Sequence, residues 1–209
     1  MTMKKIITVL TIMISIPAFS QNHFIGLKGG VNMTNVNTND FINDARIGFN
    51  AGLTYEYVVN NLFNVGVDFL YFQKGFTNEI GKNDVAEFNY DYLSIPIKVG
   101  ATTSGKFSGF VNLGVMPSFL VNAKEKIPSV ADPALTTYDV TDKVTKFDIG
   151  GMVEIGANYK IRPDFILSAS LGYQHSVTSF ANDSYFSGSE ARHYGMVLSI
   201  GVKYALIKE

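Results

Sequence analysis

Six charged residues lie in stretches where apolar and polar residues alternate, and they are the first candidates for chemistry. They are Lys28, Glu56, Asp68, Lys98, Glu154 and Lys203. Three cations and three carboxylates on the polar faces of strands can pair with one another, or they can line a narrow polar or proton path. Pairing is favoured where space is tight, because an unpaired buried charge is costly. We therefore expect these residues to form an internal charge network.

Two histidines offer a second kind of chemistry, nucleophilic catalysis. His175 and His193 flank a polar segment that holds several serines and an acid, namely Ser176, Ser179, Ser187, Ser189 and Glu190. A histidine within reach of a serine can act as its base. However, the spacing matches no hydrolase motif, and serine and histidine are ordinary in polar loops. We expect no enzyme activity.

Metal ions, cofactors and nucleic acids have little support in the sequence. Cysteine is absent, and the three histidines show no ligand spacing. Asp132, Asp139 and Asp142 could meet at a calcium ion, although an acidic surface loop is usually only solvated. No glycine-rich phosphate motif joins a strand to a helix, and the formal net charge is −1. We expect no metal, no cofactor and no nucleic-acid partner.

The elements that would position these side chains are strands. Alternation with a period of two recurs along the chain, and helical periodicity is nowhere sustained. Eight strands are predicted, at residues 23–33, 46–58, 62–74, 88–101, 107–121, 146–160, 164–175 and 193–206. Glycines within strands suit sharp curvature or close packing inside a small barrel. Such glycines are Gly26, Gly66, Gly114, Gly156 and Gly201.

The connections between the predicted strands alternate in length. Three are tight turns, at Val58–Asn61, Thr102–Lys106 and Lys160–Pro163. Four are long and polar, at Thr34–Ala45, Gly75–Glu87, Asn122–Thr145 and Ser176–Arg192. This alternation through an even number of antiparallel strands is typical of outer-membrane barrels, which have tight periplasmic turns and longer outside loops.

The faces of the strands allow two kinds of closed barrel. One face of each strand is apolar and uncharged, as at Val111, Leu113 and Val115, whereas the six charges lie on the opposite faces. A lipocalin-like soluble barrel would turn the apolar faces inward, around a small ligand. A membrane barrel would turn the same faces toward lipid.

Aromatic residues on the apolar faces favour the membrane barrel. Near the short turns lie Tyr57, Phe63, Tyr159, Phe165 and Tyr204. Toward the long loops lie Phe49, Tyr71, Phe119, Phe147, Tyr173 and Tyr194. Two belts of amphipathic rings are favoured at the two lipid–water interfaces. We therefore predict an all-β, eight-stranded antiparallel up-and-down transmembrane β-barrel whose outside contacts outer-membrane lipid.

The N-terminal residues predict export. MTMKK is positively charged, IITVLTIMISIPAF is apolar, and Ala18-Phe19-Ser20 has the small residues of a cleavage site. This is the layout of a cleaved secretory signal, and the apolar run is shorter than the roughly 20 residues of a membrane-spanning helix. We expect residues 1–20 to be a signal peptide and residues 21–209 to form one β-barrel domain in the outer membrane of a Gram-negative bacterium.

Several motifs in the mature chain carry a resemblance to a known family. They are FIGLKGGVNMTNV, GFNAGLTYEY, FNVGVDFLYFQKG, YDYLSIPIKVG and GMVLSIGVKY. Together they resemble the PorT-like outer-membrane β-barrel family, also called the outer membrane protein beta-barrel domain or "porin family". The resemblance covers the mature chain and implies the barrel fold, but no particular activity. Such barrels often end on an aromatic residue, whereas this chain continues for five residues past Tyr204.

The narrow barrel suggests where function lies. The interior of an eight-stranded barrel is filled by side chains. We therefore expect a non-enzymatic outer-membrane protein that contacts another protein or a surface ligand through its loops, chiefly Asn122–Thr145. The alternative is a small-solute pore, and a further alternative is a barrel enzyme that modifies lipid A.

Overall fold

The computed structural model describes residues 23–38, 43–60, 62–80, 85–129, 132–181 and 190–206, and of residues 129 and 132–135 it describes the backbone alone. The expected signal peptide lies outside these residues. One antiparallel sheet holds all the described strands. The strands are β1 (His23–Asn37), β2 (Asp44–Val58), β3 (Phe63–Glu79), β4 (Val85–Ser94), β5 (Ile97–Thr102), β6 (Phe107–Ser129), β7 (Asp132–Asp139), β8 (Phe147–Arg162), β9 (Phe165–Ser176) and β10 (Arg192–Ala205).

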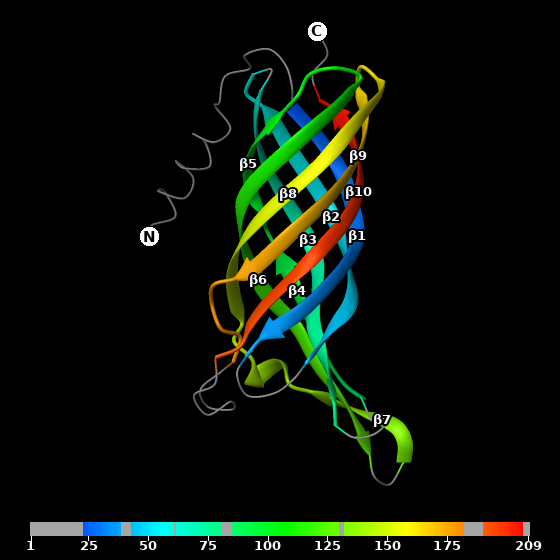
Figure 1. Ribbon diagram of the computed structural model, residues 1–209, viewed down its shortest axis with the longest axis vertical. Coiled ribbons are helices and arrows are strands. Elements are labelled where there is room, and N and C mark those ends of the chain that lie inside the picture. Colours follow the sequence, from blue (N-terminus) through cyan, green and yellow to red (C-terminus); the bar gives the residue numbers. More distant parts are fainter. Residues whose placement is uncertain are drawn as a thin grey trace, which may run out of the picture.

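The sheet closes on itself to form a barrel (Figure 1). Its first and last strands, β1 and β10, pair along their whole length, from Phe24 with Ala205 to Asn37 with Arg192. β4 and β5 occupy one position in the ring, between β3 and β6, and β7 pairs only with β6. The ring of the described strands therefore has eight positions, and the predicted all-β up-and-down barrel is confirmed.

A proline interrupts the fourth position of the ring. The sequence predicts one strand over residues 88–101, whereas the structure has β4 and β5 on either side of Ile95 and Pro96. Proline has no N–H to donate to a neighbouring strand. The sheet stays bonded across the gap, because the Ile95 N–H donates to the Pro117 carbonyl at 2.8 Å and the Asp68 N–H donates to the Pro96 carbonyl at 2.9 Å.

The two ends of the barrel differ. At the turn end, drawn at the top of Figure 1, β1 begins, β10 ends and the short connections join β2 to β3, β5 to β6 and β8 to β9. At the opposite, loop end, β7 projects well beyond the barrel. By the usual orientation of such barrels, the turn end faces the periplasm and the loop end faces the outside.

Two of the predicted loops are largely strand, which corrects the sequence-based assignment. In the predicted loop Gly75–Glu87, β3 continues to Glu79 and β4 begins at Val85. The predicted loop Asn122–Thr145 holds the last part of β6, all of β7 and a short 3₁₀ helix at Thr141–Lys143. In these extensions neither face meets lipid: Phe76, Ala123 and Glu125 are buried, whereas residues 136–139 are exposed. Their sequences therefore lack the alternation that marks a half-buried strand.

The barrel is apolar outside and polar inside. On β6, Val111, Leu113 and Val115 are exposed, while the neighbouring Asn112 is buried. The same alternation recurs in the other barrel strands. This arrangement is the reverse of a soluble barrel and is the one that lipid requires. Among the described residues, no helix is both long and apolar enough to cross a membrane.

Candidate functional site

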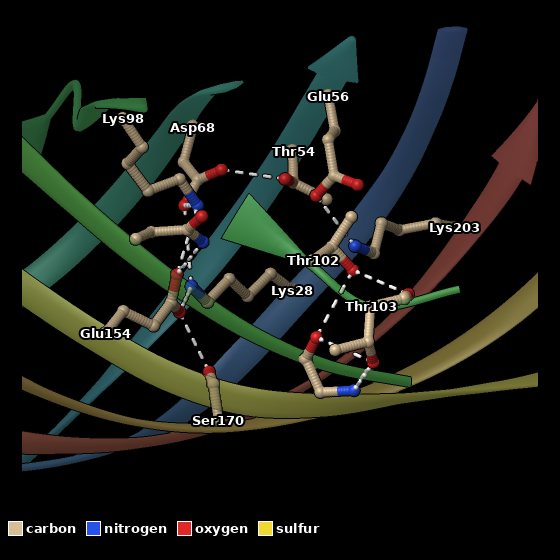
Figure 2. Close-up of polar contacts among 12 residues, drawn as sticks. Lys28, Thr54, Glu56, Asp68, Lys98, Thr102, Thr103, Glu154, Ser170 and Lys203 are labelled. Atoms are coloured by element: carbon tan, nitrogen blue, oxygen red, sulfur yellow. Dashed lines mark hydrogen bonds and ion pairs between the residues drawn. The ribbon is translucent and has the colours of Figure 1, made fainter. Parts of the chain in front are cut away.

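Four of the six predicted interior charges meet near the middle of the barrel (Figure 2). Lys98 on β5 donates to Asp68 on β3 at 2.7 Å and also approaches Glu154 on β8 at 3.5 Å. Lys28 on β1 pairs with Glu154, and it lies 3.5 Å from Asp68. The two lysines and two carboxylates therefore form a closed ring of ion pairs that spans the lumen.

Neutral side chains complete this central network. The Thr54 hydroxyl donates to Asp68 at 2.7 Å. Glu154 also accepts from the Asn112 amide at 3.1 Å and from the Ser170 hydroxyl at 2.8 Å. Charge-assisted hydrogen bonds of this kind offset the cost of burying the carboxylates.

The remaining two predicted charges form a separate pair nearer the turn end. Lys203 on β10 donates to Glu56 on β2 at 2.9 Å. The ammonium group also lies 5.6 Å from the centre of the Phe110 ring. All six residues therefore lie inside the barrel and have partners of opposite sign, but they form two groups rather than one.

Glycines on neighbouring strands make room for the long interior side chains. Lys28 lies beside Gly52 on one side and Gly201 on the other, and Lys98 lies between Gly66 and Gly114. A small residue beside a large side chain lets a narrow barrel hold two lysines and two carboxylates at one level. Three of the five strand glycines noted in the sequence, Gly66, Gly114 and Gly201, therefore lie beside lysines of the central network.

A further buried ion pair, separate from the two groups above, was missed by the sequence-based prediction. Lys74 on β3 donates to Asp148 on β8 at 2.6 Å, and both side chains are almost wholly buried. Asp148 also accepts from Ser176 at 2.7 Å and from Thr178 at 2.8 Å. The signal that could have found this pair is parity, because Lys74 is six residues after Asp68 and Asp148 is six residues before Glu154, on the same faces.

An aromatic cluster lies next to this pair, on its loop-end side. We call it the cap and define it as Tyr90, Tyr92, Phe180 and His193. Phe180 stacks on His193 with ring centres 4.3 Å apart, and the tyrosine rings lie 5.4 and 6.0 Å from His193. Each of the four is at most 2% exposed, and they adjoin a core of apolar residues from several elements.

Backbone hydrogen bonds hold the cap across the end of the barrel. The Phe180 N–H donates to the Ala191 carbonyl and the Phe180 carbonyl accepts from Thr145, both at 3.0 Å. Val144 also forms a bridge with Ala181. The segment after β9 is thus tied to the segment before β8, and Phe180 is placed over the lumen.

Among the described residues, the histidines and serines weighed as catalytic candidates form no nucleophile–base pair. His193 points inward, whereas His175 points outward and lies beside Tyr194, with ring centres 6.4 Å apart. Ser176 donates to Asp148 rather than to a histidine, and Ser179 accepts from the N–H groups of Ala181 and Ala191. Glu190 pairs with Arg192 at 2.7 Å. Ser187 and Ser189 lie outside the described residues.

The calcium candidates also have other partners. Asp139 accepts from the Thr141 N–H at 2.9 Å, and Asp142 pairs with Lys146 at 2.8 Å. The side chain of Asp132 is outside the described part. Across the described residues, no three His, Cys, Asp or Glu side chains are grouped to hold a metal ion.

The eleven aromatics predicted at the lipid interfaces all lie on the outer surface. Seven of them are exposed and four are half-buried. At the loop end, Phe119 packs against Phe147 with ring centres 5.3 Å apart. At the turn end, Tyr204 pairs with Phe165, and Tyr57 stacks on His23 at 4.8 Å. Their role as lipid-interface anchors stays a prediction.

Beyond the cap, β3, β4, β6 and β7 continue as a small sheet, which we call the projecting sheet. Phe76 and Phe88 stack at its base with ring centres 4.4 Å apart. Glu87 accepts from Lys126 at 3.1 Å, and this hydrogen bond is the main reason that the pKa of Glu87 lies below its usual value. Ile80, Val85 and Tyr138 are exposed on the projecting sheet.

Comparisons with solved structures give barrels of low sequence identity. Neisserial surface protein A shares 14% identity over 88% of this chain and 99% of its own, with a TM-score of 0.48. Ail, the attachment invasion locus protein of Yersinia pestis, shares 16% identity over 88% of this chain and 100% of its own, with a TM-score of 0.47. The outer membrane protein OprG from Pseudomonas aeruginosa shares 14% identity over 89% and 96%, with a TM-score of 0.48.

A family model gives the assignment. No curated protein matches the chain. The model described as "Outer membrane protein beta-barrel domain" matches residues 19–182, which include β1 to β9, and the fold agrees with it. The protein therefore belongs to the outer membrane protein beta-barrel domain family, in the outer membrane of a Gram-negative bacterium.

Proposed function

We propose that this barrel is a non-enzymatic binding protein, and that its projecting sheet contacts another protein or a surface component outside the cell. The observation that carries the proposal is the position of this sheet. Four strands extend past the barrel, and β7 pairs on one side only. Tyr138 on β7 is 52% exposed, and Ile80 is 59% exposed near the tip of the β3–β4 hairpin. Exposed apolar and aromatic side chains outside the lipid belt favour association.

Photo-crosslinking on intact cells tests this proposal. A photoreactive phenylalanine analogue at Tyr138 is expected to give light-dependent adducts with a discrete partner. The matched control is the same analogue at Phe107, which is exposed at the turn end. The control should give lipid adducts alone. If Tyr138 gives no adduct, or gives the same lipid adducts as Phe107, the projecting sheet is not the binding element.

Within the family, we place the chain among the PorT-like barrels. Three motifs support this, and each coincides with a structural feature. Lys28-Gly29-Gly30 supplies a lysine of the central network. Phe72-Gln73-Lys74-Gly75 supplies the lysine of the Lys74–Asp148 pair. Tyr92-Leu93-Ser94-Ile95-Pro96 supplies a cap tyrosine and the break between β4 and β5.

Export by a cleaved signal peptide is part of the same proposal. The residues concerned lie before β1 and carry the charged, apolar and small-residue regions of a secretory signal. N-terminal sequencing of protein purified from outer membranes is expected to begin at Gln21. A protein that still begins at Met1 or Thr2 would contradict cleavage.

A further inference from the structure

Three cavities follow one another along the lumen. The first, of about 130 Å³, is at the turn end and is lined by Glu56, Asn158 and Lys160 among others. The second, of about 20 Å³, is lined by Glu56, Lys28 and Glu154. The third, of about 30 Å³, is lined by Lys28, Glu154 and Gln174. Successive cavities share lining residues, because Glu56 borders the first and second, and Lys28 and Glu154 border the second and third.

The third cavity is bordered by buried polar atoms that lack a partner. Gln174 is 2% exposed, and neither its amide oxygen nor its amide nitrogen has a hydrogen-bond partner within the described chain. The same holds for the Ser199 hydroxyl and the Asn50 side-chain oxygen, and both residues line this cavity. Burying a polar group without a hydrogen bond is costly.

Water is the ligand that these groups require. A cavity needs roughly 10–15 Å³ to admit one water molecule, which must find two or more polar partners. The third cavity has the volume for about two on that scale, and Gln174, Ser199 and Asn50 supply the donors and acceptors. At the turn end, Asn158 likewise has an unpaired, buried side-chain oxygen facing the first cavity, as judged over the described residues.

The loop end of the lumen is closed by the cap. Tyr90 and Tyr92 are 0% exposed, and His193 and Phe180 stack on each other beside them. The Lys74–Asp148 pair fills the space on the lumen side of the cap, where the Lys74 ammonium lies 5.0 Å from the centre of the Tyr92 ring. The stacked rings leave almost no exposed surface at this end of the lumen, although the Tyr92 hydroxyl and both ring nitrogens of His193 are buried without a hydrogen-bond partner among the described residues.

We propose that the lumen is a hydrated half-channel. Water and small ions enter at the turn end and reach Gln174, passing the two charge groups, and the cap separates them from the outside. The central network is then solvated from both sides rather than being a dry plug. This inference is independent of the proposed binding role of the projecting sheet.

The first test locates the water directly. Met116 and Met152 line the third cavity. A brief X-ray pulse generates hydroxyl radicals from bound water, and these oxidise side chains in contact with it. In the wild-type barrel in lipid nanodiscs, both methionines are expected to be oxidised. The double variant Gln174→Leu/Ser199→Ala, which removes polar partners, should lower the oxidation severalfold. Unmodified Met116 and Met152 in the wild type would overturn the proposal.

The second test opens the cap. In planar bilayers the wild type is expected to carry no current above that of the bare membrane. The double variant Phe180→Ala/His193→Ala should carry at least ten times the bare-membrane current. Phe119→Ala, on the lipid-facing side of β6, is the matched control and should behave as the wild type. A folded cap variant that conducts no more than the wild type would overturn the proposal, as would a wild type that already conducts equally. If the cap variant fails to fold, as judged by heat-modifiable migration, the oxidation measurement decides.

Discussion

Glu154 connects the central network more extensively than its position on one strand suggests. It accepts hydrogen bonds from Lys28, Lys98, Asn112 and Ser170, which come from β1, β5, β6 and β9. Glu154 therefore links strands that are far apart in the sequence. Its loss would leave two lysines to share Asp68 alone in the lumen.

We predict that Glu154→Ala destabilises the barrel. Removing one partner of a dry, buried ion pair typically costs about 3–5 kcal/mol. Because water in the lumen reaches the lysines left behind, we expect a cost below that range. The variant should show a lower midpoint of thermal unfolding in detergent. Glu154→Gln keeps an oxygen and a nitrogen atom at the same place, so its unfolding midpoint should lie between those of the wild type and Glu154→Ala. An unchanged midpoint for Glu154→Ala would show that the network does not stabilise the fold.

The buried Lys74–Asp148 pair gives a second prediction. Lys74→Met alone leaves the Asp148 carboxylate buried with only hydroxyl donors, so it should lower the free energy of unfolding by about 3–5 kcal/mol. Adding Asp148→Asn removes the unpaired charge and should recover part of the loss. Urea unfolding of both single variants and the double variant in lipid vesicles measures the coupling. Strictly additive effects would mean that the two side chains do not interact.

At the scale of elements, the barrel strands could be predicted and the projecting sheet could not. Strands with one face in lipid and one in the lumen alternate strictly, as Val111 to Val115 do on β6, so their periodicity is visible. Lys124 to Ile127 and Thr136 to Asp139 pair outside the barrel, where both faces meet water or partner side chains. No alternation is imposed there, and the polar composition resembles that of a loop.

The candidate site, too, could be predicted from the sequence only in part. Period-two parity places Lys28, Asp68, Lys98 and Glu154 on interior faces, but it carries no information on which pairs form. That depends on the tilt of the strands and the register across the ring. The cap depends on a contact between segments far apart in the sequence, Thr145 with Phe180, which no local pattern reveals.

The projecting sheet has a pH dependence with a definite sign. Because the pKa of Glu87 is lowered, mainly by the hydrogen bond from Lys126, its contribution is present above the unfolded pKa of about 4.3 and is lost as the pH falls through the folded value. The pair is more than a third exposed, so the effect is small, at most about 1 kcal/mol. Protection of the β4 and β6 amides against hydrogen exchange, expressed relative to the intrinsic exchange rate at each pH, should fall at acid pH, and Lys126→Met should abolish that dependence. Equal pH dependence in the wild type and in Lys126→Met would show that the Glu87–Lys126 pair is not its cause.

At the scale of the whole molecule, the position of the barrel in the membrane predicts which surface substitutions are tolerated. Leu113 is exposed on the lipid-facing side, at the middle of the part of β6 that pairs with β8, from Phe107 to Phe119. An arginine at the bilayer midplane costs about 2–4 kcal/mol on the lipid face of a barrel, so Leu113→Arg should lower the free energy of unfolding in vesicles by that amount. Thr137→Arg, on β7 in water, is the control and should have little effect. Equal effects of the two substitutions would place Leu113 outside the membrane.

The central claim is that the apolar faces of the strands point to lipid and the polar faces to the lumen. The chain has no cysteine, so single cysteines in lipid vesicles can carry a nitroxide at Val111, Asn112, Leu113, Val115 and Met116. We predict that oxygen, which concentrates in lipid, reaches labels at Val111, Leu113 and Val115 but not those at Asn112 and Met116, which are buried on the opposite face of β6. Strong oxygen access at Asn112 and Met116, with the apolar positions protected, would contradict the account.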